Sequence, residues 1–207
     1  MSVVKVDQLQ PRVDAGIEAL AQGDIQTGIE LFHEVLVENN DFMLAHYYLA
    51  TAYMRLQKWQ EAEKYLDTVM DLAPSWPCGS YSAGQVASVQ GFHDDAVAFF
   101  SAALKNGIDN RQGLIARGMA LYGCGRLVDA IDDLDQVITQ EMDLTALQYR
   151  MACFLGMHRY QEALSDIEAL ITLQGETEEL LDIRQECQLK IPASSAAEPI
   201  RMIDLPG

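Results

Sequence analysis

The residues best suited to chemistry are the cysteines and histidines, because thiolates and imidazoles bind metals and act as nucleophiles or bases. No two of the four cysteines are close in sequence, and no CxxC or Cys/His spacing typical of a metal site occurs. We therefore expect packed thiols rather than metal ligands or a redox pair. These scattered residues are Cys78, Cys124, Cys153, Cys187, His33, His46, His93 and His158.

Two acidic runs offer carboxylates that bind cations where they converge. We interpret His93-Asp94-Asp95 as the start of a helix, where acids complement the helix dipole, rather than as a metal site. We interpret the acidic run 132–135 as a solvated helix face. The chain has no phosphate-binding GxxxxGK loop, no HExxH and no GxSxG motif. The sequence therefore predicts no enzyme, no cofactor and no metal.

The net charge of the chain limits the classes of partner that it can bind. The formal net charge is −17, from 31 acidic and 14 basic residues. Such a surface repels nucleic acid and anionic lipid, and it is compatible with a basic protein partner or with solubility alone. No apolar run reaches the roughly 18–20 residues that span a bilayer, and residues 1–7 lack a secretory signal. We expect a cytoplasmic protein that contacts neither membrane nor nucleic acid.

The elements that must position these side chains repeat with a period of about 34 residues. After an N-terminal extension (1–8), aligned short turns divide the chain into five segments. The second segment carries the clearest pattern, with Tyr53, Trp59, Ala62 and Pro74 at regular positions. The segments are 9–42, 43–76, 77–110, 111–143 and 144–176.

This pattern resembles the tetratricopeptide repeat (TPR) family over residues 9–177, although the usual first-helix tryptophan is absent and the closing proline appears only as Pro74. The resemblance implies an all-α fold, a right-handed α-solenoid of about five TPR helix pairs. Small residues such as Gly84 and Gly118 fall where paired helices must approach closely, which supports that fold independently. Glycines that suit a positive φ fall at the turns: Gly23, Gly91 and Gly125.

Both ends of the array have expected roles. Residues 177–190, with Thr177 as N-cap, are predicted to form a capping helix that covers the last pair. Residues 191–207 read as a linker followed by an apolar C-terminal tail. We hypothesise that residues 200–207 of this tail fold into the chain's own groove, or into a neighbour's, until a partner displaces them.

The resemblance also implies that first helices line a concave groove. Carried over position by position, this groove is rich in tyrosine, and Asp14 and Arg55 are its only charged residues. Tyrosine and methionine offer large apolar area, which suits peptide binding. The predicted groove residues are Tyr47, Tyr48, Thr51, Met54, Arg55, Tyr81, Gln85, Met119, Tyr122, Gln148 and Tyr149.

These observations predict a scaffold or adaptor that binds a partner segment in its groove, most simply an apolar segment with basic flanks. Two alternatives stay open. One is a dedicated chaperone for an apolar or secreted protein, similar in size and charge to those of type III secretion. The other is a self-assembling scaffold, in which repeat ends join copies of the chain into a homo-oligomer.

Overall fold

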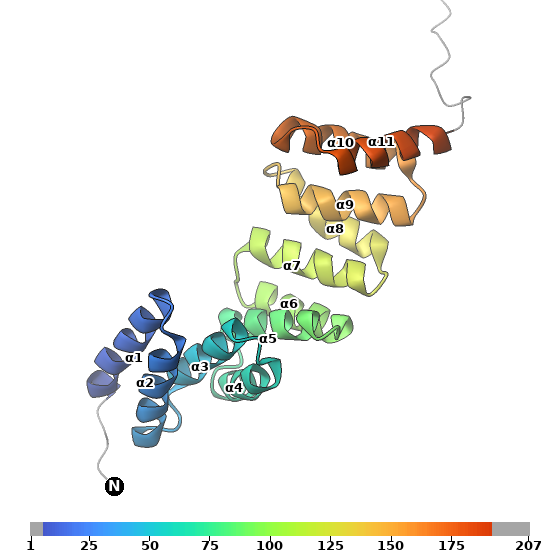
Figure 1. Cartoon of the computed structure of the whole chain (residues 1–207). Helices are drawn as coiled ribbons and strands as arrows, with labels where there is room; N and C mark the ends of the chain where they lie inside the picture. Colours follow the sequence, from blue (N-terminus) through green and yellow to red (C-terminus); the bar gives the residue numbers. More distant parts are fainter. Residues whose placement is uncertain (1–5, 192–207) are drawn as a thin grey trace, which may run out of the picture.

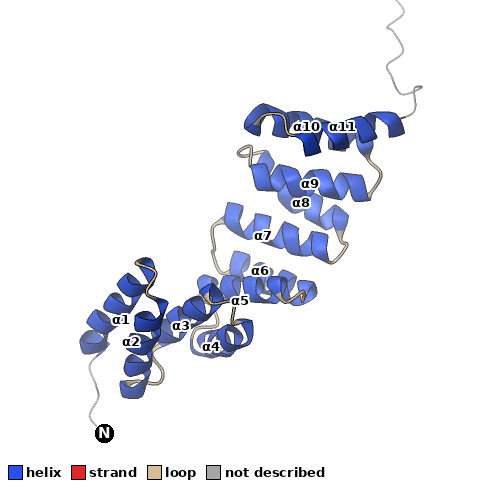
Figure 2. Cartoon of the chain, in the orientation of Figure 1, coloured by secondary structure: helices blue, strands red, loops and turns tan. Residues whose placement is uncertain are grey.

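The computed structural model describes residues 6–191, with side chains from Leu9 onward. Within this range the chain forms eleven α-helices joined by short loops and no strand (Figure 2). The helices are α1 (Val6–Ala21), α2 (Ile25–Glu38), α3 (Met43–Arg55), α4 (Trp59–Leu72), α5 (Pro77–Val89), α6 (His93–Lys105), α7 (Asn110–Gly123), α8 (Leu127–Ile138), α9 (Leu144–Gly156), α10 (Tyr160–Gln174) and α11 (Glu178–Lys190).

The helices stack as five successive pairs, from α1 and α2 at one end to α9 and α10 at the other, with α11 against α10 (Figure 1). This arrangement confirms the predicted all-α solenoid. The first helix begins at Val6, three residues before the predicted start of the first repeat. The last begins after Thr177, whose side chain accepts a hydrogen bond from the backbone N–H of Leu180 at 3.3 Å.

Paired helices approach closely where one of them carries glycine. A Cβ atom at Gly84 would lie 2.6 Å from the ring of Phe100, and one at Gly16 would lie 2.6 Å from the ring of Phe32. Each ring therefore packs directly on helix backbone. Alanines fill equivalent close positions in the second helices and are fully buried: Ala62, Ala96, Ala130 and Ala163.

Every helix pair turns through one residue with a positive φ. Gly23, Gly91 and Gly125 hold this position with φ of 85°, 84° and 73°. Gln57 and His158 hold it in the other two pairs, at 57° and 59°. The turn geometry is thus the same in all five pairs, whether or not glycine is present to adopt it without strain.

The interpretation of the run 132–135 as a solvated face is wrong for its central residue. Asp132 is exposed, but Asp133 is 4% exposed and accepts two hydrogen bonds of 2.7 Å from the Arg117 guanidinium. Asp135 accepts a hydrogen bond from the Arg150 guanidinium of α9. Buried carboxylates need such partners because desolvating a lone charge is costly.

The cysteines are free in the described structure, and only two are buried. Cys153 and Cys187 lie in the core, whereas Cys78 and Cys124 are half-buried. Burial raises the pKa of the Cys153 thiol to about 11. No helix between residues 6 and 191 is long and apolar enough to cross a bilayer. The hypothesis that the C-terminal tail enters the groove concerns residues 192–207, which lie outside the described residues.

Candidate functional site

A cavity of about 400 Å³ opens between α3 and α5. The predicted groove residues Tyr47, Thr51, Met54 and Arg55 form its α3 side, because i, i+4 and i+7 positions share one helix face. Trp59 at the start of α4 closes one end. The α5 side consists of Ser82, Gln85 and Val89.

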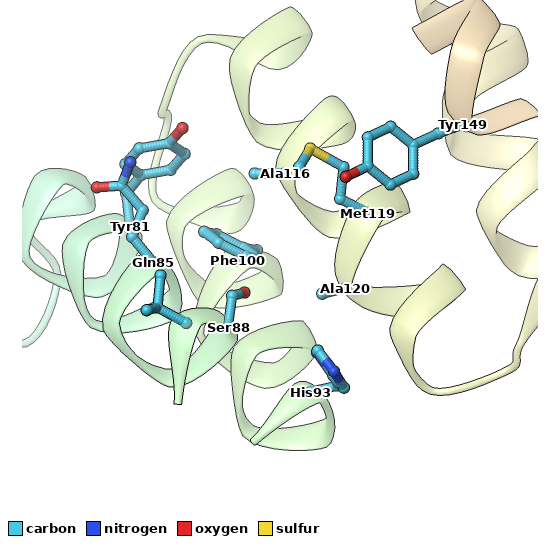
Figure 3. A pocket seen from close by; sticks show the side chains of 10 residues that line it. Tyr81, Gln85, Ser88, His93, Phe100, Ala116, Met119, Ala120 and Tyr149 are labelled. Atoms are coloured by element: carbon cyan, nitrogen blue, oxygen red, sulfur yellow. The ribbon is translucent and has the colours of Figure 1, made fainter. Parts of the chain in front are cut away.

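A second cavity of about 400 Å³ continues across α5 toward α7 and α9 (Figure 3). Four predicted groove residues meet here: Tyr81 and Gln85 from α5, Met119 from α7 and Tyr149 from α9. Figure 3 shows the Met119 side chain beside the Tyr149 ring, with Phe100 lying deeper between the helices. The remaining lining is Ser88, Val89, His93, Phe100, Ala116 and Ala120.

The two cavities are neighbours, because Gln85 and Val89 line both. Val89 is 59% exposed although it is apolar, so the shared wall presents hydrocarbon to solvent. Together the cavities form one groove that runs from Tyr47 on α3 to Tyr149 on α9. The groove lining holds no acid, and Arg55 and His93 are its only basic residues.

Aromatic contacts hold the groove walls in place. Tyr47 packs edge-on against Trp76, with ring centroids 4.7 Å apart, and Tyr81 packs on Phe100 at 5.4 Å. Such pairs restrict the rings and leave less conformational entropy to lose on binding. Arg55 is held as well, since its guanidinium donates to the carbonyl oxygen of Leu20 at the end of α1.

Three of the predicted groove residues lie outside both cavities. Tyr48 turns away and stacks on Phe32 of α2 at 5.6 Å, within the first hydrophobic cluster. Burial first, and then neighbouring Tyr47, raises the pKa of the Tyr48 hydroxyl. Tyr122 is exposed and contacts Tyr149 edge-on at 5.7 Å, and Gln148 is exposed on α9.

Eight lining residues are absent from the predicted list. Four of them, Ser82, Ser88, Val89 and Ala116, lie at first-helix groove positions that the family resemblance implies, and the other four were not expected at the groove. Trp59 and His93 are the first residues of α4 and α6, 34 positions apart, so the repeat register itself contained the signal that second helices also reach the groove. Phe100 and Ala120 are buried residues whose surfaces form the floor. A Cβ at Gly123 would lie 2.7 Å from the His93 ring, so this glycine makes room for the imidazole.

The groove offers binding area rather than reactive groups. Among residues 6–191 no set of three His, Cys, Asp or Glu side chains could hold a metal ion. Asp94 and Asp95 lie in the first turn of α6, where they complement the helix dipole. The lining of tyrosine, tryptophan, methionine and valine is suited to contact with an apolar surface.

Comparison with known proteins agrees with this architecture. Two models of the tetratricopeptide repeat family match residues 19–77 and 81–143. A curated relative, DnaJ homolog subfamily C member 3 of Homo sapiens, is 23% identical over 187 residues, and its Gallus gallus counterpart is 22% identical over 188. The matches cover 83% of this chain and 37% of either relative, so the chain spans little more than a third of their length.

Solved structures share the fold at low identity. MamA 41-end from Desulfovibrio magneticus RS-1 superposes with a TM-score of 0.76 at 16% identity, covering 83% of this chain and 98% of that one. YrrB, described as a TPR protein with an unusual peptide-binding site, gives 0.68 at 19%, covering 76% and 82%. With family models that together match more than half of the chain, five stacked helix pairs and these structural neighbours, the chain belongs to the tetratricopeptide repeat family.

Proposed function

We propose that this repeat scaffold binds an apolar segment of a partner protein in the groove between Tyr47 and Tyr149. Membership of the TPR family implies a scaffold for protein–protein interaction. The observation that carries the finer proposal is the pair of adjoining cavities, about 400 Å³ each, whose walls are aromatic and nearly uncharged. The peptide-binding site ascribed to YrrB supports a peptide as the class of guest.

The partner segment has basic flanks in this proposal. The chain carries 31 acids against 14 basic residues, while the groove lining holds none of those acids. An apolar centre would therefore enter the neutral groove while flanking lysine or arginine meets the acidic exterior. Complementary charge of this kind raises the rate of association and its dependence on salt.

Val89 allows a test that leaves the fold intact, because its exposed side chain lines both cavities. Peptides would be selected from a random display library on the wild-type chain, and their affinities measured by isothermal titration calorimetry. We expect selected peptides to be apolar with basic flanks. The Val89→Asp variant should bind them at least about tenfold more weakly, because the carboxylate would be desolvated against apolar groups.

Val37→Asp is the matched control. Val37 is 87% exposed on α2 and lines neither cavity, so this variant acquires the same charge away from the groove. It should keep wild-type affinity. Equal losses in both variants would show that net charge, not the groove, governs binding, and unchanged affinity in both would place the peptide elsewhere on the molecule.

A further inference from the structure

A third cavity, of about 280 Å³, lies between α4, α5 and α6. Its α5 residues occupy the helix face opposite to that of the groove, since Ala83, Val86 and Ala87 alternate with Tyr81, Gln85 and Ser88. The floor is apolar and the rim carries three carboxylates, Glu63, Asp67 and Asp95. The remaining walls are Leu66, Met70, Gln90, Phe92 and Phe99.

The equivalent positions of the later repeats show which side chain fits beside such an acceptor. Arginines spaced 33 or 34 residues apart lie at equivalent positions of α7, α9 and α11, each of which follows a complete helix pair. Each arginine reaches from its own helix to the second helix of the preceding pair. The bonds are Arg117 Nη1 to Ser101 Oγ (3.3 Å), Arg150 Nη1 to Asp135 Oδ1 (2.5 Å) and Arg184 Nη1 to Glu168 Oε1 (3.5 Å).

Two of these arginines also pair with a carboxylate on the second helix of their own pair. The Nε and Nη2 atoms of Arg117 donate to Asp133 at 2.7 Å each, and those of Arg150 donate to Asp166 at 3.0 and 2.5 Å. Each guanidinium is thereby held between the second helix of its own pair and the second helix of the preceding pair. Planar bidentate pairing of this kind is specific to arginine.

The third repeat keeps an acceptor on the preceding pair, but it has neither the arginine nor the carboxylate of the arginine's own pair. Counting back 34 residues from Ser101, Arg117 and Asp133 gives Asp67, Ala83 and Phe99, and all three line the cavity. Asp67 therefore occupies the place of the acceptor that binds an arginine in the later repeats. Ala83 occupies the place of the arginine itself and is too short to reach Asp67.

The carboxylates of this cavity lack an internal counterion. Across residues 9–191, no lysine, arginine or histidine forms a salt bridge with Glu63, Asp67 or Asp95. Burial, followed by the charges of Glu63 and Asp71, raises the pKa of Asp67. The corresponding cavity between α6, α7 and α8 has the same volume of about 280 Å³, but Arg117 and Arg126 lie in its walls beside its acids.

We infer that the cavity between α4, α5 and α6 receives an arginine side chain of a basic partner protein, with Asp67 as the anion that its guanidinium contacts. Phe92, 56% exposed, and Phe99 offer ring faces for the guanidinium plane. The chain itself shows this contact elsewhere, where Arg159 lies 4.7 Å from the ring centre of Phe154. A second copy of the chain would meet a like charge of −17, which favours a basic protein as the source.

The test uses the full chain with ¹³C-labelled alanine methyl groups. The probe is a blocked peptide with one arginine between two leucines, and the comparison peptide carries neutral citrulline instead. We expect the arginine peptide to shift the Ala83 methyl resonance saturably and the citrulline peptide to bind about tenfold more weakly. Equal binding of the two peptides, or shifts confined to the groove alanines, would overturn the inference.

Asp67→Asn and Asp71→Asn separate the local carboxylate from general charge. Asp71 lies one turn further along α4 and does not line the cavity. Asp67→Asn should weaken the arginine peptide by about tenfold, and Asp71→Asn by less than about twofold. Equal losses would show that the peptide senses only the overall charge.

Ala83→Arg supplies the arginine from within the chain. We expect it to raise the melting temperature and abolish binding of the arginine peptide, whereas Ala83→Met, similar in length but uncharged, should not gain stability from Asp67. If Ala83→Arg/Asp67→Asn melts as high as Ala83→Arg, Asp67 is not the guanidinium partner and the inference fails. If the wild type dimerises by sedimentation and Asp67→Asn does not, a second copy fills the cavity and the basic-partner assignment is wrong.

Discussion

Gln57 and His158 stand where the other three turns have glycine, and both adopt a positive φ. A side chain in this conformation brings Cβ close to the backbone carbonyl, at a cost of roughly 1–2 kcal/mol. The strain persists because the helices on either side are fixed by packing. His158 has some compensation, since its Nδ1 lies 2.9 Å from the Tyr160 hydroxyl. The side chain of Gln57 forms no hydrogen bond within residues 9–191.

Gln57→Gly should therefore stabilise the protein. Glycine removes the strain but gains more freedom in the unfolded chain, so we expect a net gain of about 0.5–1 kcal/mol in the free energy of unfolding. Urea denaturation followed by circular dichroism would measure it. The reverse exchange, Gly91→Gln, should lose a similar amount; a Gln57→Gly variant less stable than wild type would show that the turn at 57 is not strained.

At the scale of the helix, the cost of replacing a glycine at a close helix contact depends on whether a ring or a flexible side chain faces it. Phe100 presents a rigid ring 2.6 Å from where a Cβ at Gly84 would lie. Leu134 presents its Cγ at 3.0 Å from the equivalent point at Gly118, and a leucine can change rotamer. The same exchange to alanine thus meets different resistance in α5 and α7.

Gly84→Ala is expected to lower the free energy of unfolding by about 1–3 kcal/mol through overpacking, despite the better helix propensity of alanine. Gly118→Ala serves as the comparison and should be nearly neutral, because propensity offsets the milder crowding. Chemical denaturation of both variants measures the difference. Equal stabilities would mean that Phe100 moves as easily as Leu134.

The sequence alone predicted the helix pairs well, because the 34-residue register repeats five times and each turn is marked. It predicted the groove less completely. Tyr47 and Tyr48 point about 100° away from each other on α3, and only Tyr47 shares the helix face of Thr51 and Met54. Tyr47 lines the groove, whereas Tyr48 packs on Phe32.

Side-chain pairing across helices was the part that the sequence did not reveal. Asp133 looked solvated because it lies in an acidic run, and its partner Arg117 is 16 residues away on another helix. The signal was nevertheless present in the regular spacing of Arg117, Arg150 and Arg184. Recurrence of a charged residue at the repeat period indicates an interaction between repeats, just as recurrence of alanine indicates close packing.

Across the whole array, the interfaces between successive helix pairs differ in whether an arginine joins them. From α6 onward each junction has a guanidinium that joins neighbouring pairs, whereas the α4–α5 junction has Ala83 and a cavity instead. Repeat proteins are held by nearest-neighbour interfaces, so a weaker interface divides the array into parts that open separately.

We expect α1–α4 to open at lower free energy than α7–α10. Native-state hydrogen exchange, read by mass spectrometry, should give amides in α3 and α4 an opening free energy about 1–3 kcal/mol below that of α8 and α9. A single opening free energy throughout the described helices would contradict this and show that the array unfolds as one unit.

The chain has only two tryptophans, and both lie at the α3 end of the groove: Trp59 lines the first cavity and Trp76 packs on Tyr47. Indole emission therefore arises entirely from this one neighbourhood. A guest that covers Trp59 or displaces Tyr47 from Trp76 should shift the emission of the unlabelled protein. An arginine entering the cavity beside Asp67, on the opposite face of α5, would cover neither indole, so it should shift the emission less than a guest in the groove does.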